Sequence, residues 1–149
     1  AAWLRSRGAE TAATKSLFNI SKEEYEARAA IVEGAYLYKG CAIATSDELD
    51  PAMSVVLPMA ANDLLTINGV DASFVAVQVG TGVNISARSL GAVNVQVIME
   101  SLGGGGHQTV AGVQLKNISV EEVKKQIIAL AKKQLEEIDN NESDLTARY

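Results

Sequence analysis

The sequence has few of the residues that build metal and redox centres. Its 149 residues include one histidine and one cysteine, so no internal disulfide can form, which fits a reducing compartment. Cys41 lies in the apolar run 41–44, and we therefore expect a buried structural thiol rather than a nucleophile. No run is long and apolar enough for a membrane-spanning helix, and we expect no signal peptide. Because the chain does not begin with Met, we expect a piece of a longer protein.

The chain is also poor in positive charge. It has 13 Lys and Arg against 18 Asp and Glu, which gives a net charge of −5. This balance argues against a broad electrostatic contact with long nucleic acid, whereas a small phosphorylated ligand needs only one local basic pocket. The apolar fraction of 48% and the charged fraction of 21% are ordinary for a globular protein. The length predicts one domain with a sizeable core.

Hydrophobic periodicity predicts helices that alternate with strands. Helices are expected over residues 1–8, 10–18, 21–36, from the loop at Pro51 to about 67, 94–102 and 119–140. Strands are expected over residues 41–45, 72–79, 83–88 and 109–115, the middle two joined as a hairpin. Pro58 either begins the fourth helix or kinks it. This order predicts an α/β fold, a mixed β-sheet flanked by helices.

Apolar positions at helical spacing predict the buried faces of three helices. They are Tyr25, Ala29, Val32 and Tyr36 in the first, Val95, Ile98, Met99 and Leu102 in the second, and Val123, Ile127, Leu130, Leu135 and Ile138 in the last. Capping boxes at Ser21 and Ser119 and an N-cap at Asn94 mark where these helices begin. Residues 141–149 are expected to form a frayed polar tail.

Four consecutive glycines, 103–106, precede the only histidine, His107. Glycine loses more conformational entropy on folding than any other residue, so such a run is rarely needed just to turn the chain. Consecutive glycine N–H groups can converge on an anion such as a phosphate, and a neighbouring histidine adds a donor whose charge changes near neutral pH. A flexible linker is the alternative. The position of the run between a helix and a strand favours a ligand cradle.

Polar and apolar residues alternate along the strand 83–88. Because successive side chains of a strand point to opposite faces, Asn84, Ser86 and Arg88 share a face that is either exposed to solvent or built for a ligand. If this strand neighbours the strand after His107, the guanidinium, the imidazole and the glycine N–H groups converge into a phosphate clamp. A surface salt bridge for Arg88 and a buried core position for His107 are the alternatives.

No motif for phosphoester chemistry itself is visible in the sequence. The GxxxxGK[ST] phosphate loop is missing, and so is a carboxylate–histidine cluster that could hold a pair of metal ions. The acidic segment 46–51 matches no metal-binding pattern and is expected to be a solvated loop. We therefore expect the substrate-binding half of an active site, with no catalytic residue and no metal ligand in this chain.

Several segments resemble the DHH-associated C-terminal domain of DHH-family phosphoesterases. The signature is Gly104-Gly105-Gly106-His107 followed by Ala111-Gly112. Segments 68–75, 85–89 and 94–102 resemble the subgroup that hydrolyses cyclic di-AMP. Residues 1–20 resemble the end of the preceding DHH domain with its linker helices, and residues 21–140 resemble the DHH-associated substrate-binding domain. Val110 departs from the pattern, because the family often has a smaller residue there.

The resemblance implies that one domain holds the metal ions and another binds the substrate. The DHH domain, outside this chain, would hold two manganese ions, while this chain would bind no cofactor and would be inactive in isolation. Its substrate would be a cyclic dinucleotide or a short oligonucleotide. Substrate and phosphate would contact Ser86, Arg88, Gly104, Gly105, Gly106 and His107, with Asn84 and Asn94 as weaker candidates; an N-cap role explains Asn94 equally well. The parent would be anchored in the bacterial membrane at its cytoplasmic face, without direct membrane contact by this domain, and could form a homodimer.

Three other interpretations remain open from the sequence. The same kind of domain occurs in oligoribonucleases that are also nucleotide phosphatases, and the flanking segments rather than the glycines favour cyclic di-AMP. A related domain ends alanyl-tRNA synthetases, and the low number of Lys and Arg argues against such an RNA-binding module. In the third interpretation the glycines are only structural, and Arg88 and His107 affect nothing but stability.

Overall fold

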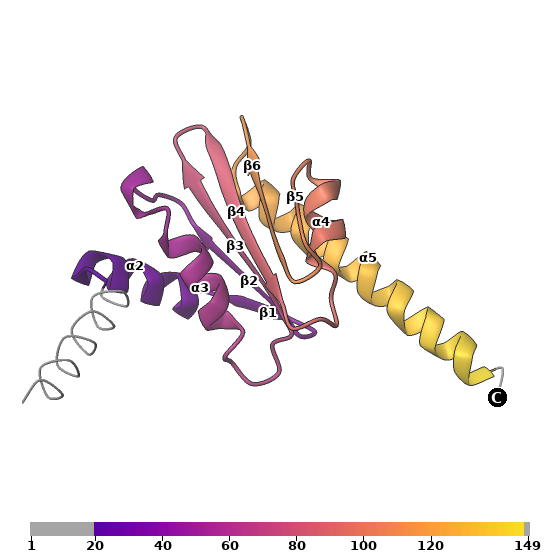
Figure 1. Cartoon of the computed structure of the whole chain (residues 1–149). Coiled ribbons are helices and arrows are strands. Elements are labelled where there is room, and N and C mark those ends of the chain that lie inside the picture. The colour runs from indigo at the N-terminus through magenta and orange to yellow at the C-terminus, as the bar shows by residue number, and fades with distance from the viewer. Residues whose placement is uncertain (1–19, 148–149) are drawn as a thin grey trace, which may run out of the picture.

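The computed structural model describes residues 20–147, so the helices expected within residues 1–18 lie outside the described residues. The helices are α2 (Lys22–Glu33), a short 3₁₀ helix η1 (Pro51–Met53), α3 (Val56–Leu64), α4 (Val95–Ser101) and α5 (Val120–Ala147). The strands are β1 (Tyr36–Tyr38), β2 (Cys41–Ser46), β3 (Ala72–Val79), β4 (Gly82–Ser89), β5 (Gly105–Gly106) and β6 (Val110–Leu115). Figure 1 shows their arrangement.

The six strands form one mixed sheet in the order β1-β2-β3-β4-β6-β5. β2 and β3 pair in parallel, joined through η1 and α3, and every other neighbouring pair is antiparallel. The predicted α/β fold with a mixed sheet flanked by helices is therefore confirmed. The predicted hairpin is confirmed too, because β3 and β4 pair along their whole length from Ala72↔Ser89 to Val79↔Gly82.

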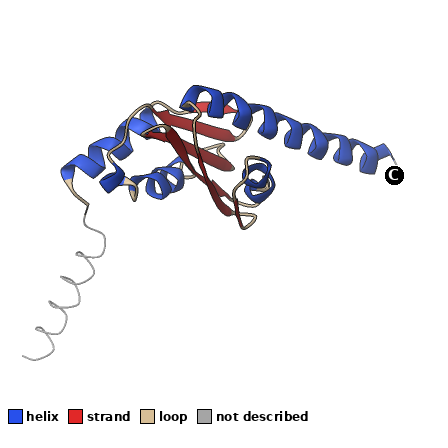
Figure 2. Cartoon of the chain, turned by 90° about the horizontal axis from the view of Figure 1, so that it is seen from above, coloured by secondary structure: helices blue, strands red, loops and turns tan. Residues whose placement is uncertain are grey.

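Helices cover both faces of the sheet, as the two views in Figures 1 and 2 show. On one face α4 and α5 bury a cluster built around Phe74, Ile98 and Ile127. On the other face α2 and α3 bury a second cluster, to which β2 contributes Ala42 and Ala44. Since alternate residues of each strand point to opposite faces, β3 supplies Val75 and Val77 to the second cluster and Phe74 to the first.

The first described helix ends earlier than its periodicity predicts. Gly34 caps α2, and Tyr36 begins the edge strand β1, which the sequence did not reveal. A two-residue turn with positive φ at Lys39 (44°) and Gly40 (83°) then reverses the chain, the geometry that suits the twist of a hairpin. A strand of three residues is too short to show an alternating pattern.

The packing face of α2 also differs from the prediction. Tyr25 and Ala29 are exposed, whereas Ile31 is buried, and Ala27 and Val32 pack against the core. Only Val32 of the predicted set contributes. The helix is alanine-rich and weakly amphipathic, so its apolar positions define two stripes, and the contact with α3 selects one of them.

Two further helix boundaries are clear in the structure. α3 begins at Val56, so Pro58 lies in its first turn, where backbone N–H groups have no partner within the helix. Of the two interpretations for Pro58, a helix that begins near it is confirmed. α5 continues to Ala147, so residues 141–147 of the expected frayed tail are helical. The C-terminal half of α5 projects beyond the sheet (Figure 2).

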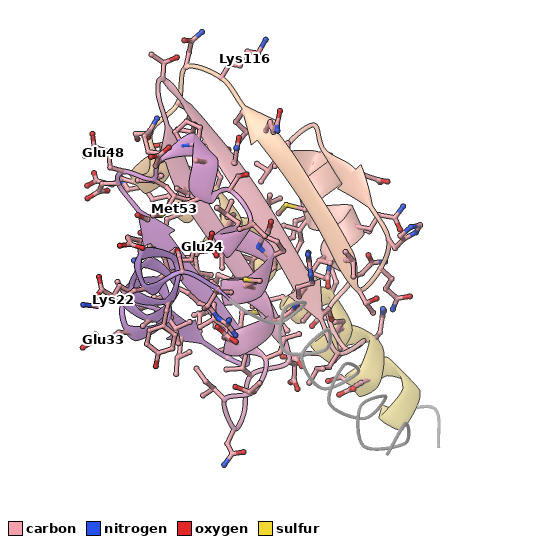
Figure 3. All side chains as sticks on the ribbon, turned by 60° about the vertical axis from the view of Figure 1, so that its left-hand side comes forward. Lys22, Glu24, Glu33, Glu48, Met53 and Lys116 are labelled. Atoms are coloured by element: carbon pink, nitrogen blue, oxygen red, sulfur yellow. The ribbon has the colours of Figure 1, made fainter. Side chains whose placement is uncertain are left out.

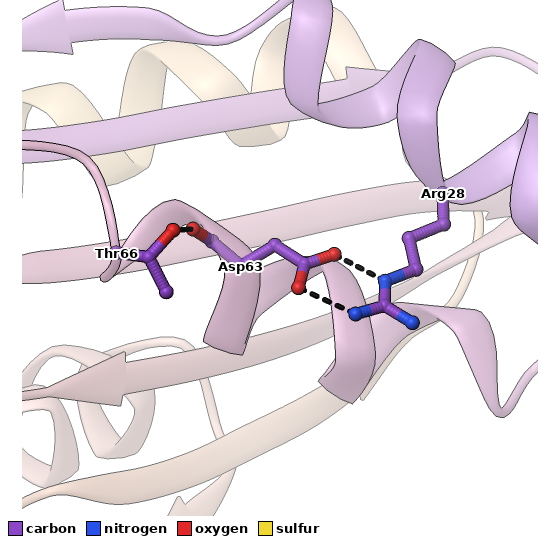
Figure 4. Close-up of polar contacts among 3 residues, drawn as sticks. All are labelled: Arg28, Asp63 and Thr66. Atoms are coloured by element: carbon purple, nitrogen blue, oxygen red, sulfur yellow. Dashed lines mark hydrogen bonds and ion pairs between the residues drawn. The ribbon is translucent and has the colours of Figure 1, made fainter. Parts of the chain in front are cut away.

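An ion pair fastens α2 to α3. The Arg28 Nε donates to Asp63 Oδ2, and the Arg28 Nη2 donates to Asp63 Oδ1 at 2.6 Å, while the Thr66 hydroxyl donates to the Asp63 carbonyl (Figure 4). The hydrogen bond to Asp63 raises the pKa of Arg28, against the opposing effect of burial. The two parallel hydrogen bonds fix the angle between these helices, because they constrain both side chains in one plane.

No helix within residues 20–147 is long and apolar enough to cross a membrane.

The buried thiol of Cys41 gives a first prediction. Cys41 is 0% exposed, and burial, with a smaller effect of the Asp71 charge, raises the pKa of its thiol from 9.0 to about 11. We expect no reaction of the folded chain with Ellman's reagent at pH 8 and full reaction in denaturant. The stability that comes from the neutral thiol is complete below pH 9, and up to about 3 kcal/mol of it disappears as the pH rises through 11.

The control is Cys41→Ala, which should unfold with a shallower pH dependence above pH 9. Rapid labelling of the native thiol at pH 8 would contradict the prediction.

Candidate phosphate-binding site

Pairing across the sheet brings three of the predicted segments into one row. Ser86 of β4 lies opposite Gly112 of β6, and Gly112 lies opposite Gly105 of β5. Residues directly opposite each other in antiparallel strands present their side chains on the same face. The row therefore carries one hydroxyl and two positions without a side chain, on the face that α2 and α3 share. Ser86, Gly105 and Gly112 are all partly exposed.

The next row contains the two charged candidates. Arg88 lies opposite Val110, and the N–H of His107 donates to the carbonyl of Val110 at 2.6 Å. Neighbouring strands lie about 4.8 Å apart, so the main chains of Arg88 and His107 are roughly 10 Å apart across Val110. The predicted condition, that their strands are neighbours, is met. Val110 is 46% exposed and stands between the two candidates on this surface.

Arg88 is held in place without a counter-charge. Its Nη1 donates to the carbonyl of Ala87 at 2.9 Å, and partial burial lowers the pKa of the guanidinium. Charged side chains labelled in Figure 3, such as Glu24, Glu33 and Glu48, lie on α2 and on the loop after β2. Among residues 20–147 no carboxylate forms an ion pair with Arg88, so the salt-bridge interpretation does not apply to it there.

His107 is exposed to solvent. The alternative of a buried core histidine is therefore wrong. Its backbone closes the turn between β5 and β6 through the hydrogen bond to Val110, which leaves the imidazole at the end of the row that contains Arg88. An exposed imidazole and a partly buried guanidinium are both hydrogen-bond donors to an anion.

The structure makes different demands on the four glycines of residues 103–106. Gly103 has a φ of 93° at the end of α4, and Gly106 a φ of 140°, both in the region that favours glycine. A Cβ at Gly104 would lie 2.3 Å from the Gly112 carbonyl, and one at Gly106 would lie 2.4 Å from the Val110 carbonyl. A Cβ at Gly105 would meet nothing within 4 Å. Gly103, Gly104 and Gly106 are thus required by the fold, and Gly105 alone has neither a positive φ nor a steric contact that demands glycine.

An open cleft of about 530 Å³ adjoins this surface. One wall is formed by α3 and the turn before it, and the floor by β4 and β6. Its lining comprises Ser54, Leu57, Asn84, Ile85, Ser86, Gly112, Val113 and Gln114. The cleft brings Asn84 and Ser86 together, as their alternation predicts, and lies within the range of volumes typical of small-molecule sites.

Asn94 lies elsewhere and is engaged by other contacts. Its side chain accepts from the Val97 N–H and caps α4, as predicted, while its backbone exchanges two hydrogen bonds with the Gln134 amide. α4 packs on the opposite face of the sheet from Ser86 and Arg88. These contacts give Asn94 a structural role.

The residues of the chain that the structure describes contain no group of three or more His, Cys, Asp or Glu side chains that could hold a metal ion. They do not fit the manganese pair that the resemblance implies, and the site formed here contributes hydrogen-bond donors and one guanidinium.

Sequence reasoning assigned only Asn84 and Ser86 of the eight lining residues to a site, and the side chains that it missed include Ser54, Leu57 and Gln114. The signal for Gln114 was present, because the alternation of Ala111 and Val113 with Gly112 and Gln114 gives β6 a second face like that of β4. No pattern in the sequence could assign Ser54 and Leu57, since only the packing of α3 on the sheet brings them to β4.

Comparisons with known proteins agree with this fold. Residues 39–137 match the family model described as DHHA1 domain. The chain is 47% identical over 129 residues to the cyclic-di-AMP phosphodiesterase GdpP of Geobacillus thermodenitrificans, covering 85% of this chain and 20% of that protein. It is 42% identical over 131 residues to the cyclic-di-AMP phosphodiesterase PdeA of Listeria monocytogenes, covering 87% and 20%. The chain thus spans about a fifth of the length of these relatives.

A solved structure shares the fold at low sequence identity. An exopolyphosphatase-related protein from Bacteroides fragilis superposes with a TM-score of 0.70 at 17% identity, over 83% of this chain and 38% of that one. The likeness is one of fold.

The glycines give a prediction that separates packing from ligand contact. Gly104→Ala and Gly106→Ala should each lower the free energy of unfolding by at least about 2 kcal/mol, because the new methyl group overlaps backbone atoms of β6. Gly105→Ala should cost less than about 1 kcal/mol, since its methyl group meets open space. Urea unfolding of the three variants measures the difference, and equal losses at all three positions would contradict it.

Proposed function

The chain belongs to the DHHA1 domain family, and we propose that it is the substrate-binding domain of a phosphodiesterase that hydrolyses cyclic di-AMP to linear di-adenylate. Two relatives whose names state this activity support the substrate, at 47% and 42% identity over most of this chain. In this proposal the manganese ions that the resemblance implies belong to a DHH domain outside this chain, and the longer protein is anchored in the membrane.

The observation that carries the proposal is the guanidinium of Arg88. Taking a cation partly out of water costs free energy unless an opposite charge compensates for it, and no carboxylate of the described chain pairs with Arg88. A phosphate supplies that charge in the geometry that a guanidinium recognises, with two parallel N–H···O bonds. Arg88 in this arrangement is ready for an anionic ligand.

The neighbouring residues complete a binding surface for a phosphodiester. The hydroxyl of Ser86 and the imidazole of His107 are donors in the two rows that contain Gly105 and Arg88. Gly105 and Gly112 leave the main chain accessible between them, so a bulky phosphate can approach closely. These groups hold the substrate and offset the charge of its phosphate, whereas the attack on phosphorus takes place in the other domain.

Binding of linear di-adenylate to the 149-residue chain tests the proposal. In an NMR titration we expect shifts at Arg88, Gly105 and His107, and an affinity that falls about tenfold to a hundredfold in Arg88→Ala, because a hydrogen-bonded charge is lost. Arg88→Lys should bind at an intermediate level, since an ammonium lacks the paired donors of a guanidinium. His107→Ala should lose the shifts at the end of the row.

The matched control is Lys116→Ala, which removes one positive charge from the exposed turn after β6. It should leave the affinity within about twofold, since a lone exposed charge contributes little. Equal weakening by Lys116→Ala and Arg88→Ala would show a general charge effect and contradict the site, as would the absence of shifts at millimolar ligand.

A second test concerns the division of work between domains. We expect the purified chain to release no linear di-adenylate from cyclic di-AMP with manganese present, because its described residues offer no cluster of metal ligands. The longer protein should hydrolyse it, and Arg88→Ala in that protein should lower kcat/KM. Chromatography of the products measures both, and manganese-dependent turnover by the chain alone would overturn the assignment.

A further inference from the structure

Two amide side chains stand side by side at the far end of the cleft from Arg88. Asn84 of β4 and Gln114 of β6 are direct partners in the antiparallel pairing, so their side chains lie on the same face with Cβ atoms about 5 Å apart. Both line the cleft of about 530 Å³. Asn84 is partly exposed and Gln114 is exposed.

Neither amide is used by the fold. Other glutamines and asparagines of the chain have structural hydrogen bonds: Gln78 bridges the β3–β4 turn and the start of α5, and Gln134 holds the backbone of Asn94. Among the hydrogen bonds of residues 20–147, none involves the side chain of Asn84 or Gln114. Each therefore keeps a carbonyl acceptor and two N–H donors available to a ligand.

The rest of the cleft suits a flat ring. Gly112, opposite Ser86, lies between the Asn84–Gln114 pair and the Arg88–Val110 pair. It has no side chain, and a Cβ there would lie 2.8 Å from the Ile85 carbonyl. Leu57 of α3, only 4% exposed, forms an apolar wall, and Ser54 stands at the rim. A planar heterocycle can lie over the Gly112 backbone against Leu57 with its polar edge toward the amides.

We propose that the Asn84–Gln114 pair reads the base of the bound nucleotide and selects adenine over guanine. This inference rests on the proposed function, because the phosphate of the same nucleotide is held at Arg88. Arg88 and Asn84 are four residues apart on β4, or roughly 13 Å between their Cα atoms. This span accommodates a nucleotide whose phosphate lies at Arg88, whose sugar lies over the row of Ser86 and Gly112, and whose base lies at Asn84.

The preference follows from the pattern of donors and acceptors. Adenine presents the N6 amino donor beside the N7 acceptor, which one primary amide matches with its carbonyl and its N–H group. On the same N7 edge, guanine presents O6 and N7, two neighbouring acceptors, which match paired donors such as those of arginine or lysine. An amide facing guanine leaves its carbonyl against an acceptor, and the unpaired group weakens binding.

Paired titrations of the 149-residue chain with linear di-adenylate and linear di-guanylate test this inference. The wild-type chain should bind di-adenylate about tenfold more tightly. The double variant Asn84→Ala/Gln114→Ala should bind the two dinucleotides within about threefold of each other, mainly through weaker binding of di-adenylate. Gln126→Ala, which alters a partly exposed amide on α5, is the control and should keep the full preference.

The outcomes distinguish this inference from the proposed function. Binding that depends on Arg88 but shows the same base preference in the wild type and the double variant overturns the role of Asn84 and Gln114 alone. The same holds if the wild type binds both dinucleotides equally. Failure of the wild type to bind either dinucleotide at millimolar concentration overturns the proposed function, and this inference with it. Circular dichroism of the double variant establishes that its fold is intact.

Discussion

The close approach of the glycine segment to β6 is the constraint on which the candidate site depends. Gly104 and Gly106 lie so near the backbone of β6 that any side chain at either position overlaps it. This contact makes β5 the outermost strand and places Gly105 in the row of Gly112 and Ser86. It also brings the main chain of His107 within hydrogen-bond distance of Val110, and so toward Arg88. Glycine here serves packing first, and the accessible surface is a consequence of that packing.

The unequal covering of the two faces leaves this row of residues accessible. α4 and α5 close one face over a continuous apolar cluster. On the other face α3 has nine residues, about 13 Å of helix, and packs on β3 and β4. The polar positions of β4 and β6 beyond it remain open, and the edge of α3 becomes the wall of the cleft.

Charge acts locally in this protein. The net charge of −5 gives no general attraction for phosphates, and the acidic side chains labelled in Figure 3 lie on α2 and on the loop before η1. In the proposed function, recognition of an anion depends on one partly buried guanidinium, whose burial strengthens its interaction with a ligand as water is excluded. Such a site favours a small ligand with one well-placed phosphate over a long polyanion, for which many exposed cations are needed.

The sequence by itself determined the elements whose signals are local. The alternation of Val83 to Arg88 determined which side chains share a face, capping residues located the starts of α2, α4 and α5, and the glycine run marked the end of α4. The sequence could not reveal β1, which is too short to show a pattern. Nor could it show which apolar stripe of α2 is buried, because the packing against α3 decides that. Tertiary structure alone decided that β6 inserts between β4 and β5, that Asn84 faces Gln114, and that Ser54 and Leu57 close the cleft. These contacts join residues far apart in the chain, and their geometry follows from strand order and helix packing, which no local pattern encodes.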